Sequence, residues 1–231
     1  MNAKFFDLFP LSVFQDKVLL SPDEKKEIIE YIFKIEKETS NIKKNSKNDA
    51  WLGDAQGHEF LFKNSKMHKL SRLISEKIKN YVEMLNIDSK KLDFYFQRSW
   101  ATITREAERI QPHAHVQSNI SFAYYLLKPE NSGDLRFTVE PPNEVSTGIF
   151  SHENIKLGLL KKIDMRNTPN ADVHIKEDDI IIFPSKARHG TIPNQTKKPR
   201  ISISGDITLM LKDSFGHEKL MPHYNKWQPF S

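Results

Sequence analysis

Three histidines and one arginine form the clearest chemical pattern of the chain. His113 and His115 are one residue apart near the middle, His189 follows a strongly apolar segment, and Arg200 comes eleven residues later. Imidazole is a good ligand for iron, and three protein ligands on one side of the ion leave positions open for oxygen and a co-substrate. A guanidinium group binds a carboxylate through two parallel hydrogen bonds. The pattern therefore predicts a mononuclear iron site with a dicarboxylate co-substrate such as 2-oxoglutarate.

The first two histidines have the spacing of neighbours on one face of a strand. Side chains two positions apart in a strand point the same way and lie roughly 6.5–7 Å apart, so His113 and His115 can reach one metal ion. Pro112 directly precedes them, which suits the start or the edge of a strand. The alternative is a pair of solvated histidines in a loop, and the pair alone is compatible with both interpretations.

The third histidine stands at the end of an expected strand. The expected strand 179–183 has an apolar run after Asp179 that Pro184 terminates, and His189 follows shortly afterwards. This order places His189 at the rim of a β-sandwich, where ligand sites are common. The alternative is a rim histidine bonded to a backbone carbonyl. Three histidines near strand ends in one β-rich region favour a metal site.

Arg200 begins a segment of alternating polar and apolar residues. In a strand, Arg200, Ser202 and Ser204 share one face. An arginine on an inward face is unfavourable unless an anion meets it. The alternative is a sheet whose polar side lies in water, as is common in antiparallel sheets. The position of Arg200 after His189 favours carboxylate binding.

Helices are expected in the first part of the chain. Ser21 and Glu24 have the spacing of a capping box, and apolar residues at helical spacing follow, so a helix is predicted over 22–38. A second apolar stripe predicts a helix over about 65–86. We expect residues 1–20 to include a short edge strand that packs on the core.

From about residue 92 onwards, aromatic and β-branched residues dominate in short runs, which is typical of strands. The expected strands are 94–104, 120–127, 135–139, 173–175, 179–183 and 200–211. Helices followed by about seven or eight strands fit a mainly β fold, with helices packed against a β-sandwich or jelly roll.

The chain is expected to form a single domain, residues 1–231. Residues 1–91 form a helical support, 92–211 the β core and 212–231 a C-terminal tail. The length fits one large core, and we detect no internal repeat. Trp227 and Phe230 in the tail are expected to dock on the core or on a partner subunit, so a homodimer is compatible with the sequence.

The composition restricts the classes of function. The 231 residues carry a net charge of +5, but no run of five or more cations occurs, which argues against nucleic-acid binding. No apolar run approaches the roughly 18 residues of a membrane span, and no secretory signal is evident, so a cytoplasmic protein is expected. The chain has no cysteine, which leaves histidine, aspartate and glutamate as candidate metal ligands.

Several stretches of the second half also carry a family resemblance. They are residues 113–126, 132–137, 182–185 with His189, 193–194 and 200–204. Over residues 100–207 the chain resembles the 2-oxoglutarate- and iron(II)-dependent oxygenase superfamily, and within it a small oxygenase family common in marine bacteria and their phages. The range 100–207 covers a little under half of the chain. The resemblance implies a cupin-like double-stranded β-helix fold.

The resemblance also implies roles for individual residues. Iron(II) would be bound at His113 and His189, and 2-oxoglutarate at Arg200 with help from Ser202, while O2 is the second co-substrate. The superfamily pattern is His-x-Asp/Glu…His, so His115 occupies the position of an acidic ligand.

The departure at His115 leaves three possibilities for the second ligand. His115 itself, a water molecule, or the carboxylate of Asp134 can complete the site. We favour His115, because imidazole is a competent iron ligand and its spacing is suitable. A neutral ligand leaves the iron one unit more positive, which changes its redox behaviour. Asn119, Tyr125 and Trp100 are expected in the pocket.

The predicted reaction is hydroxylation of a C–H bond with 2-oxoglutarate and O2, and we favour a peptide or protein side chain as the substrate. The rival enzyme is a cupin-type protein that uses His113, His115 and His189 without 2-oxoglutarate. Such a cupin would have a glutamate shortly after His115, and residues 116–119 contain none. A third alternative is a non-catalytic module that binds a metal or ligand.

Overall fold

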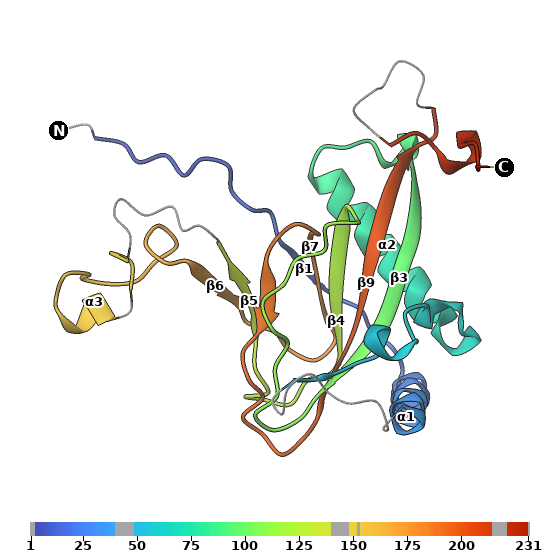
Figure 1. Ribbon diagram of the computed structural model, residues 1–231, viewed down its shortest axis with the longest axis horizontal. Coiled ribbons are helices and arrows are strands. Elements are labelled where there is room, and N and C mark those ends of the chain that lie inside the picture. Colours follow the sequence, from blue (N-terminus) through green and yellow to red (C-terminus); the bar gives the residue numbers. More distant parts are fainter. Residues whose placement is uncertain (1–2, 40–48, 140–147, 152, 214–220, 231) are drawn as a thin grey trace.

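Two antiparallel sheets face each other, and two long helices cover the outer side of the larger sheet (Figure 1). The structure is a computed structural model that describes residues 3–39, 49–139, 148–151, 153–213 and 221–230. This arrangement is the mainly β, double-stranded β-helix architecture with N-terminal helices that the sequence predicts.

The larger sheet has six strands among the described residues, all antiparallel to their neighbours. Their order across the sheet is β1 (Phe14–Lys17), β7 (Asp179–Pro184), β4 (Ile120–Leu127), β9 (Arg200–Leu211), β3 (Leu92–Thr104) and β2 (Trp51–Leu52). The long pair β3–β9 forms one half of this sheet, and it aligns Thr104 with Arg200 and Arg98 with Asp206.

The smaller sheet has three strands, in the order β6 (Asn170–Val173), β5 (Leu135–Thr138) and β8 (His189–Thr191). Strand β6 ends at Val173, so the strand expected over 173–175 lies further towards the N-terminus. The carboxylate of Asp134 explains the end of the strand, because it accepts the backbone N–H of Ile175 at 3.2 Å. A short helix, α3 (Glu153–Lys156), lies in the insert between β5 and β6.

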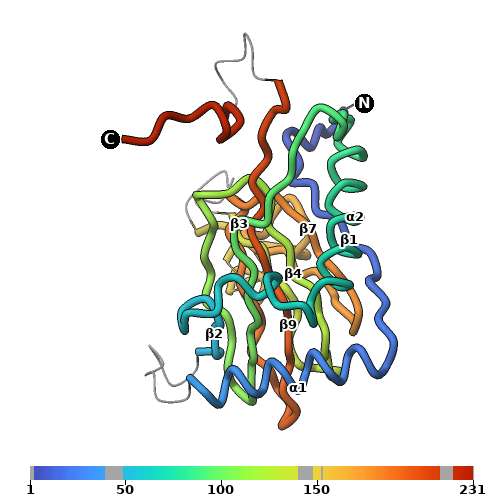
Figure 2. Tube along the Cα trace, turned by 90° about the vertical axis from the view of Figure 1, so that its right-hand side faces the viewer, coloured from blue at the N-terminus to red at the C-terminus, as the bar shows by residue number. Residues whose placement is uncertain are grey.

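Helices α1 (Pro22–Glu38) and α2 (His68–Met84) form where the apolar periodicity predicts them. Ser21 and Glu24 make the predicted capping box at the start of α1. Helix α2 begins three residues later than expected, after a 3-10 turn at Ser65–Met67. Figure 2 shows both helices running along the same side of the larger sheet.

Successive side chains of a strand point to opposite faces of the sheet, so the interior contains two hydrophobic cores. Ile201 and Ile203 of β9 belong to the core under the helices. Tyr125 of β4 and Phe183 of β7 point the other way, into the space between the two sheets. Because Arg200 and Ser202 alternate with the isoleucines, they also lie on the inter-sheet side, where the candidate site is found.

The termini lie outside these cores. Phe5 and Phe9 are exposed, and the chain joins the larger sheet only at β1, the predicted edge strand. Trp227 and Phe230 of the tail are also exposed and are not covered by the core, contrary to one of the two expectations for them. None of the helices in the described part of the chain has the length and apolar character that a membrane span requires.

The core under the helices yields a stability prediction. Leu70 of α2 is fully buried, so Leu70→Ala is expected to lower the free energy of unfolding by about 3 kcal/mol through lost burial and a residual cavity. Met84→Ala, in the same helix but with a side chain 71% exposed, should change it by less than about 0.5 kcal/mol. Urea unfolding monitored by circular dichroism measures both, and equal effects would contradict the assigned packing.

Candidate metal centre

Backbone pairing brings two distant histidines together. His113 and His189, the first residue of β8, form an isolated antiparallel bridge in which each N–H donates to the other carbonyl at 2.8 Å. The N–H of His115 donates to the carbonyl of Ser185 at 2.9 Å. The first two histidines are therefore not in a regular strand, as the spacing had suggested. Pro112 lacks the N–H that would extend the pairing.

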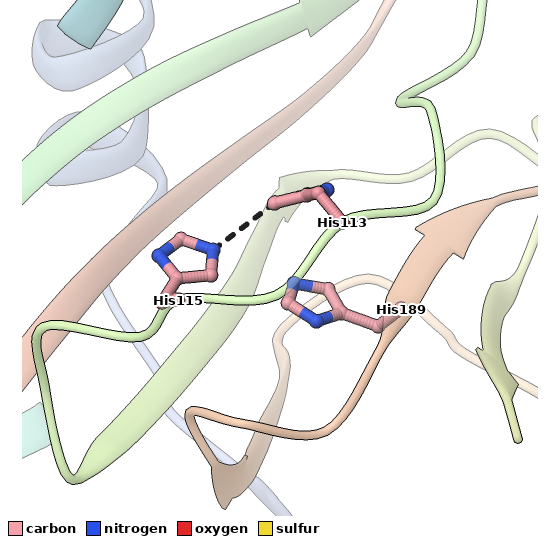
Figure 3. Close-up of side chains that lie close together, drawn as sticks. All are labelled: His113, His115 and His189. Carbon is pink, nitrogen blue, oxygen red and sulfur yellow. Dashed lines mark hydrogen bonds between the residues drawn. The ribbon is translucent and has the colours of Figure 1, made fainter. Parts of the chain in front are cut away.

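The three imidazole rings converge on one point (Figure 3). One nitrogen from each of His113, His115 and His189 lies within 4.8 Å of the other two. The Nε2 atoms of His113 and His115 are 3.0 Å apart. His115 and His189 are buried, and His113 is half-buried, so the cluster lies below the protein surface.

Each ring is held from behind through its Nδ1 atom. Nδ1 of His113 lies 2.8 Å from the carbonyl oxygen of Gln111, and Nδ1 of His189 lies 2.8 Å from that of Ala187. Nδ1 of His115 lies 2.8 and 3.0 Å from the two carboxylate oxygens of Asp206. These partners only accept hydrogen bonds, so each Nδ1 carries the proton and donates. Each neutral ring then directs an Nε2 lone pair into the cluster.

This arrangement fits a metal ion. Two Nε2 lone pairs facing each other at 3.0 Å repel unless a proton or a cation lies between them. Imidazole–metal bonds of about 2.1 Å place adjacent ligand atoms about 3 Å apart, which agrees with the separation between His113 and His115. Fixing the far ring nitrogen on a carbonyl or carboxylate is also the usual support for metal-binding histidines.

Burial keeps the rings of His113 and His189 neutral in the metal-free protein. Loss of hydration lowers the pKa of His189 to about 3, and the nearby His113 ring adds to the effect. Burial also lowers the pKa of His113 from its ordinary value. A neutral imidazole is the form that binds a metal, so the electrostatics of the site favour coordination over protonation.

Asp206 is a buried residue of the site that the sequence reasoning missed. It follows Arg200, Ser202 and Ser204 on the same face of β9, so the alternation that singled out those residues could have found it. Burial opposes ionisation of Asp206, but hydrogen bonds from His115 and Arg98 outweigh this and hold its pKa below the ordinary value. The site therefore contains a buried carboxylate directly behind His115.

Arg200 lies fully buried at the start of β9. One terminal nitrogen donates to the carbonyls of Ser132 and Gly133, at 2.7 and 2.9 Å. The other donates to the hydroxyls of Thr104 and Thr191, at 3.2 and 2.9 Å. No carboxylate of the described residues forms an ion pair with it, so its charge has hydrogen-bonding partners but no counter-ion.

Gly133 makes the close approach to Arg200 possible. Its φ is +88°, and a Cβ at this position would lie 2.9 Å from the guanidinium of Arg200 and 2.1 Å from the carbonyl oxygen of Ile192. Only a glycine accommodates both the backbone conformation and this crowding. The position of Arg200 thus depends on a backbone feature that precedes β5.

A cavity of about 920 Å³ extends from the cluster between the two sheets. The residues that line it around the cluster include the three histidines, Trp100, Thr102, Tyr125, Thr191, Ser202 and Ser204. Trp100 stacks against the His115 ring, with centroids 5.6 Å apart. The hydroxyl of Thr191 both accepts from Arg200 and lines the cavity, which connects the buried arginine with the space above it.

Two other predicted residues are placed elsewhere. The side chain of Asn119 accepts the N–H of Leu209 at 2.8 Å and supports the sheet, and it is not among the cavity residues. Asp134 contacts His174 at 3.0 Å and Lys128 at 3.5 Å, outside the histidine cluster. These partners hold Asp134 away from the histidine cluster, which is called the triad below. The geometry therefore favours His115 over Asp134 as the third ligand.

The comparison with protein families agrees with this geometry. A sequence model of the family described as "Putative 2OG-Fe(II) oxygenase" matches residues 98–206, the range that contains the three histidines, Arg200 and Asp206. Over this range, a little under half of the chain, the sequence is that of the 2-oxoglutarate- and iron(II)-dependent oxygenases. Iron(II), 2-oxoglutarate and O2 are the cofactor and co-substrates of this class of enzyme. A search of curated proteins gave no match.

Solved structures of oxygenases share the fold of this superfamily member. The epimerase SnoN from nogalamycin biosynthesis is 13% identical, with a TM-score of 0.56 over 92% of this chain and 88% of that chain. A prolyl-4-hydroxylase from Pseudomonas putida is 11% identical, with a TM-score of 0.51 over 86% and 93%. HygX from Streptomyces hygroscopicus, solved with nickel and 2-oxoglutarate, is 8% identical, with a TM-score of 0.51 over 92% and 91%.

The lowered pKa of His189 predicts how the stability of the metal-free protein depends on pH. Between about pH 6.5 and 3 the unfolded chain protonates this histidine while the folded chain does not. The free energy of unfolding therefore falls as the pH decreases through this window, with a slope of up to about 1.4 kcal/mol per pH unit from this group. Denaturant unfolding across the window should give a shallower slope for His189→Gln, and parallel curves would contradict the assignment.

Proposed function

We propose that this oxygenase hydroxylates a C–H bond of a peptide or protein side chain. His113, His115 and His189 hold iron(II), and Arg200 binds the distal carboxylate of 2-oxoglutarate. The convergence of three unprotonated Nε2 atoms at the end of a cavity is the observation that carries this proposal. When bound, iron(II) and 2-oxoglutarate together supply the activation of O2 and the oxidising power that the C–H bond requires.

The binding of 2-oxoglutarate is supported by the donors that surround Arg200. Thr191 accepts hydrogen bonds from both Arg200 and the N–H of Ile110, so its hydroxyl proton remains available to an incoming carboxylate. Burial raises the pKa of Tyr125 to about 12, so its phenol also remains a donor. With Ser202, these groups provide hydrogen bonds around one fixed positive charge, as suits a carboxylate.

The size and lining of the cavity support a substrate larger than 2-oxoglutarate. Its lining also includes Trp51, Arg98 and Arg105, the last of which forms a two-point ion pair with Glu36. Aromatic surface with hydrogen-bonding groups suits a peptide segment. A prolyl-4-hydroxylase is among the proteins that share the fold.

We propose that residues 1–231 act as one domain, with 1–91 as a support for the β core 92–211.

Succinate formation tests the proposed function. Anaerobically iron-loaded protein is mixed with 2-oxoglutarate, O2 and a library of peptides, and succinate is quantified by mass spectrometry. Succinate is expected with the unmodified protein and a mass gain of one oxygen on the accepted peptide. His189→Ala should abolish both products and bind less iron, because it removes one of three ligands. Absence of succinate from fully iron-loaded protein would overturn the proposal.

Replacing Arg200 is expected to lower the affinity of the protein for 2-oxoglutarate. Arg200→Ala should weaken 2-oxoglutarate binding to the nickel-loaded protein roughly 10- to 100-fold, because a charge-assisted hydrogen bond contributes about 1.5–3 kcal/mol. Arg136→Ala is the matched control. Arg136 of β5 pairs with Asp172 of β6 and does not line the cavity. Isothermal titration calorimetry measures both affinities. An unchanged affinity in folded Arg200→Ala would show that this arginine does not bind the co-substrate.

A further inference from the structure

Asp206 is the only carboxylate of the described residues that contacts a ring of the triad through hydrogen bonding. Its side chain is fully buried, and its two oxygens lie 2.8 and 3.0 Å from Nδ1 of His115. The acidic residues that line the cavity have different partners: Asp54 pairs with Arg98 at 3.4 Å, Glu36 pairs with Arg105 at 2.6 Å, and Asp49 accepts from Gln111 at 3.1 Å. The triad therefore has one carboxylate behind one ligand only.

Three further side chains hold Asp206 in place. Arg98 donates to one carboxylate oxygen at 3.0 Å, and Gln117 donates to the same oxygen at 3.3 Å. The hydroxyl of Ser121 donates to the other oxygen at 2.9 Å. A carboxylate fixed by this many donors has one orientation. It therefore presents a fixed acceptor to His115 and keeps its Nε2 directed at the other two rings.

Because the proposed third ligand is a histidine, the carboxylate of Asp206 is the negative charge that lies directly behind the ligand set. Three imidazole ligands bring no negative charge to a divalent cation, whereas the pattern of the superfamily that the chain resembles has an acidic ligand at the position of His115. A carboxylate that accepts the far N–H of a ligand histidine increases the electron donation of that ring. Asp206 thus lies where a negative charge can act on the metal through one hydrogen bond.

We propose that Asp206 replaces the missing acidic ligand from behind His115. As a positioning residue, it supplies the compensating negative charge and fixes the ring, without touching the metal. This inference rests on the proposed iron site. It extends that site by assigning charge balance to a specific residue outside the ligand set.

The substitution Asp206→Asn separates charge from hydrogen bonding. Its amide oxygen can take the place of the oxygen that accepts from His115 and Arg98, while its NH2 group can donate to the hydroxyl of Ser121. The substitution thus removes the negative charge and the oxygen 2.8 Å from Nδ1 of His115, while the oxygen at 3.0 Å still accepts the Nδ1 proton. The matched control is Asp179→Asn, which changes a buried carboxylate of β7 that pairs with Lys17 and does not line the cavity.

Metal affinity provides the test. Nickel(II) binding measured by calorimetry should be roughly 10- to 100-fold weaker in Asp206→Asn than in the unmodified protein. It should be unchanged in Asp179→Asn. In the His115→Ala background, Asp206→Asn should have little further effect, because the carboxylate acts through that ring. The Fe(III)/Fe(II) reduction potential should also rise in Asp206→Asn, since a lost negative charge disfavours the ferric state.

The outcomes distinguish this inference from the function on which it depends. If the unmodified protein binds no metal, or His189→Ala binds it equally well, the proposed site itself is wrong. If the triad binds metal but Asp206→Asn has unchanged affinity and potential, only the role of Asp206 is overturned. Nitrogen NMR of the unmodified protein is independent of variant folding. A His115 ring protonated at Nε2 instead of Nδ1 would also contradict the inference.

Discussion

The pair of backbone hydrogen bonds between His113 and His189 is the contact on which the candidate site depends. It joins the loop before β4 to the first residue of β8, and so connects segments 76 positions apart in the chain. One pairing fixes two candidate ligand residues at once, and His115 then needs only its own bond to Ser185 to complete the cluster of three histidines. The ligands are thus positioned by backbone contacts with β8 and the turn before it, which is a rigid support for a metal site.

Buried polar groups then determine the chemical character of the site. The three rings point their lone pairs inwards because each Nδ1 is satisfied by an acceptor behind it. Arg200 retains its charge in the interior because carbonyls and hydroxyls surround it, yet it lacks a counter-ion among the described residues. The inward lone pairs of the three histidines suit a metal ion, and the charge of Arg200 without a counter-ion suits a carboxylate of a dicarboxylate.

The same face of β9 connects these two features. Arg200, Ser202, Ser204 and Asp206 alternate along it, from the buried arginine at the start of the strand to the carboxylate behind His115. A single strand thereby contributes to both the proposed carboxylate site and the charge around the metal. The opposite face of β9 packs under the helices, so the stability of the helical layer and the alignment of the site depend on one element.

The sequence by itself determined the helices, most strands and the three histidines that form the candidate metal site, because capping, periodicity and residue type are local properties of the chain. It also singled out Arg200 and Ser202, since alternation within one strand assigns them a common face. Only the tertiary structure decided that Asp134 lies outside the cluster and that Asp206 lies behind His115. Those relations depend on contacts between residues far apart in the sequence, and hydrogen-bond partners at such distances leave no local pattern.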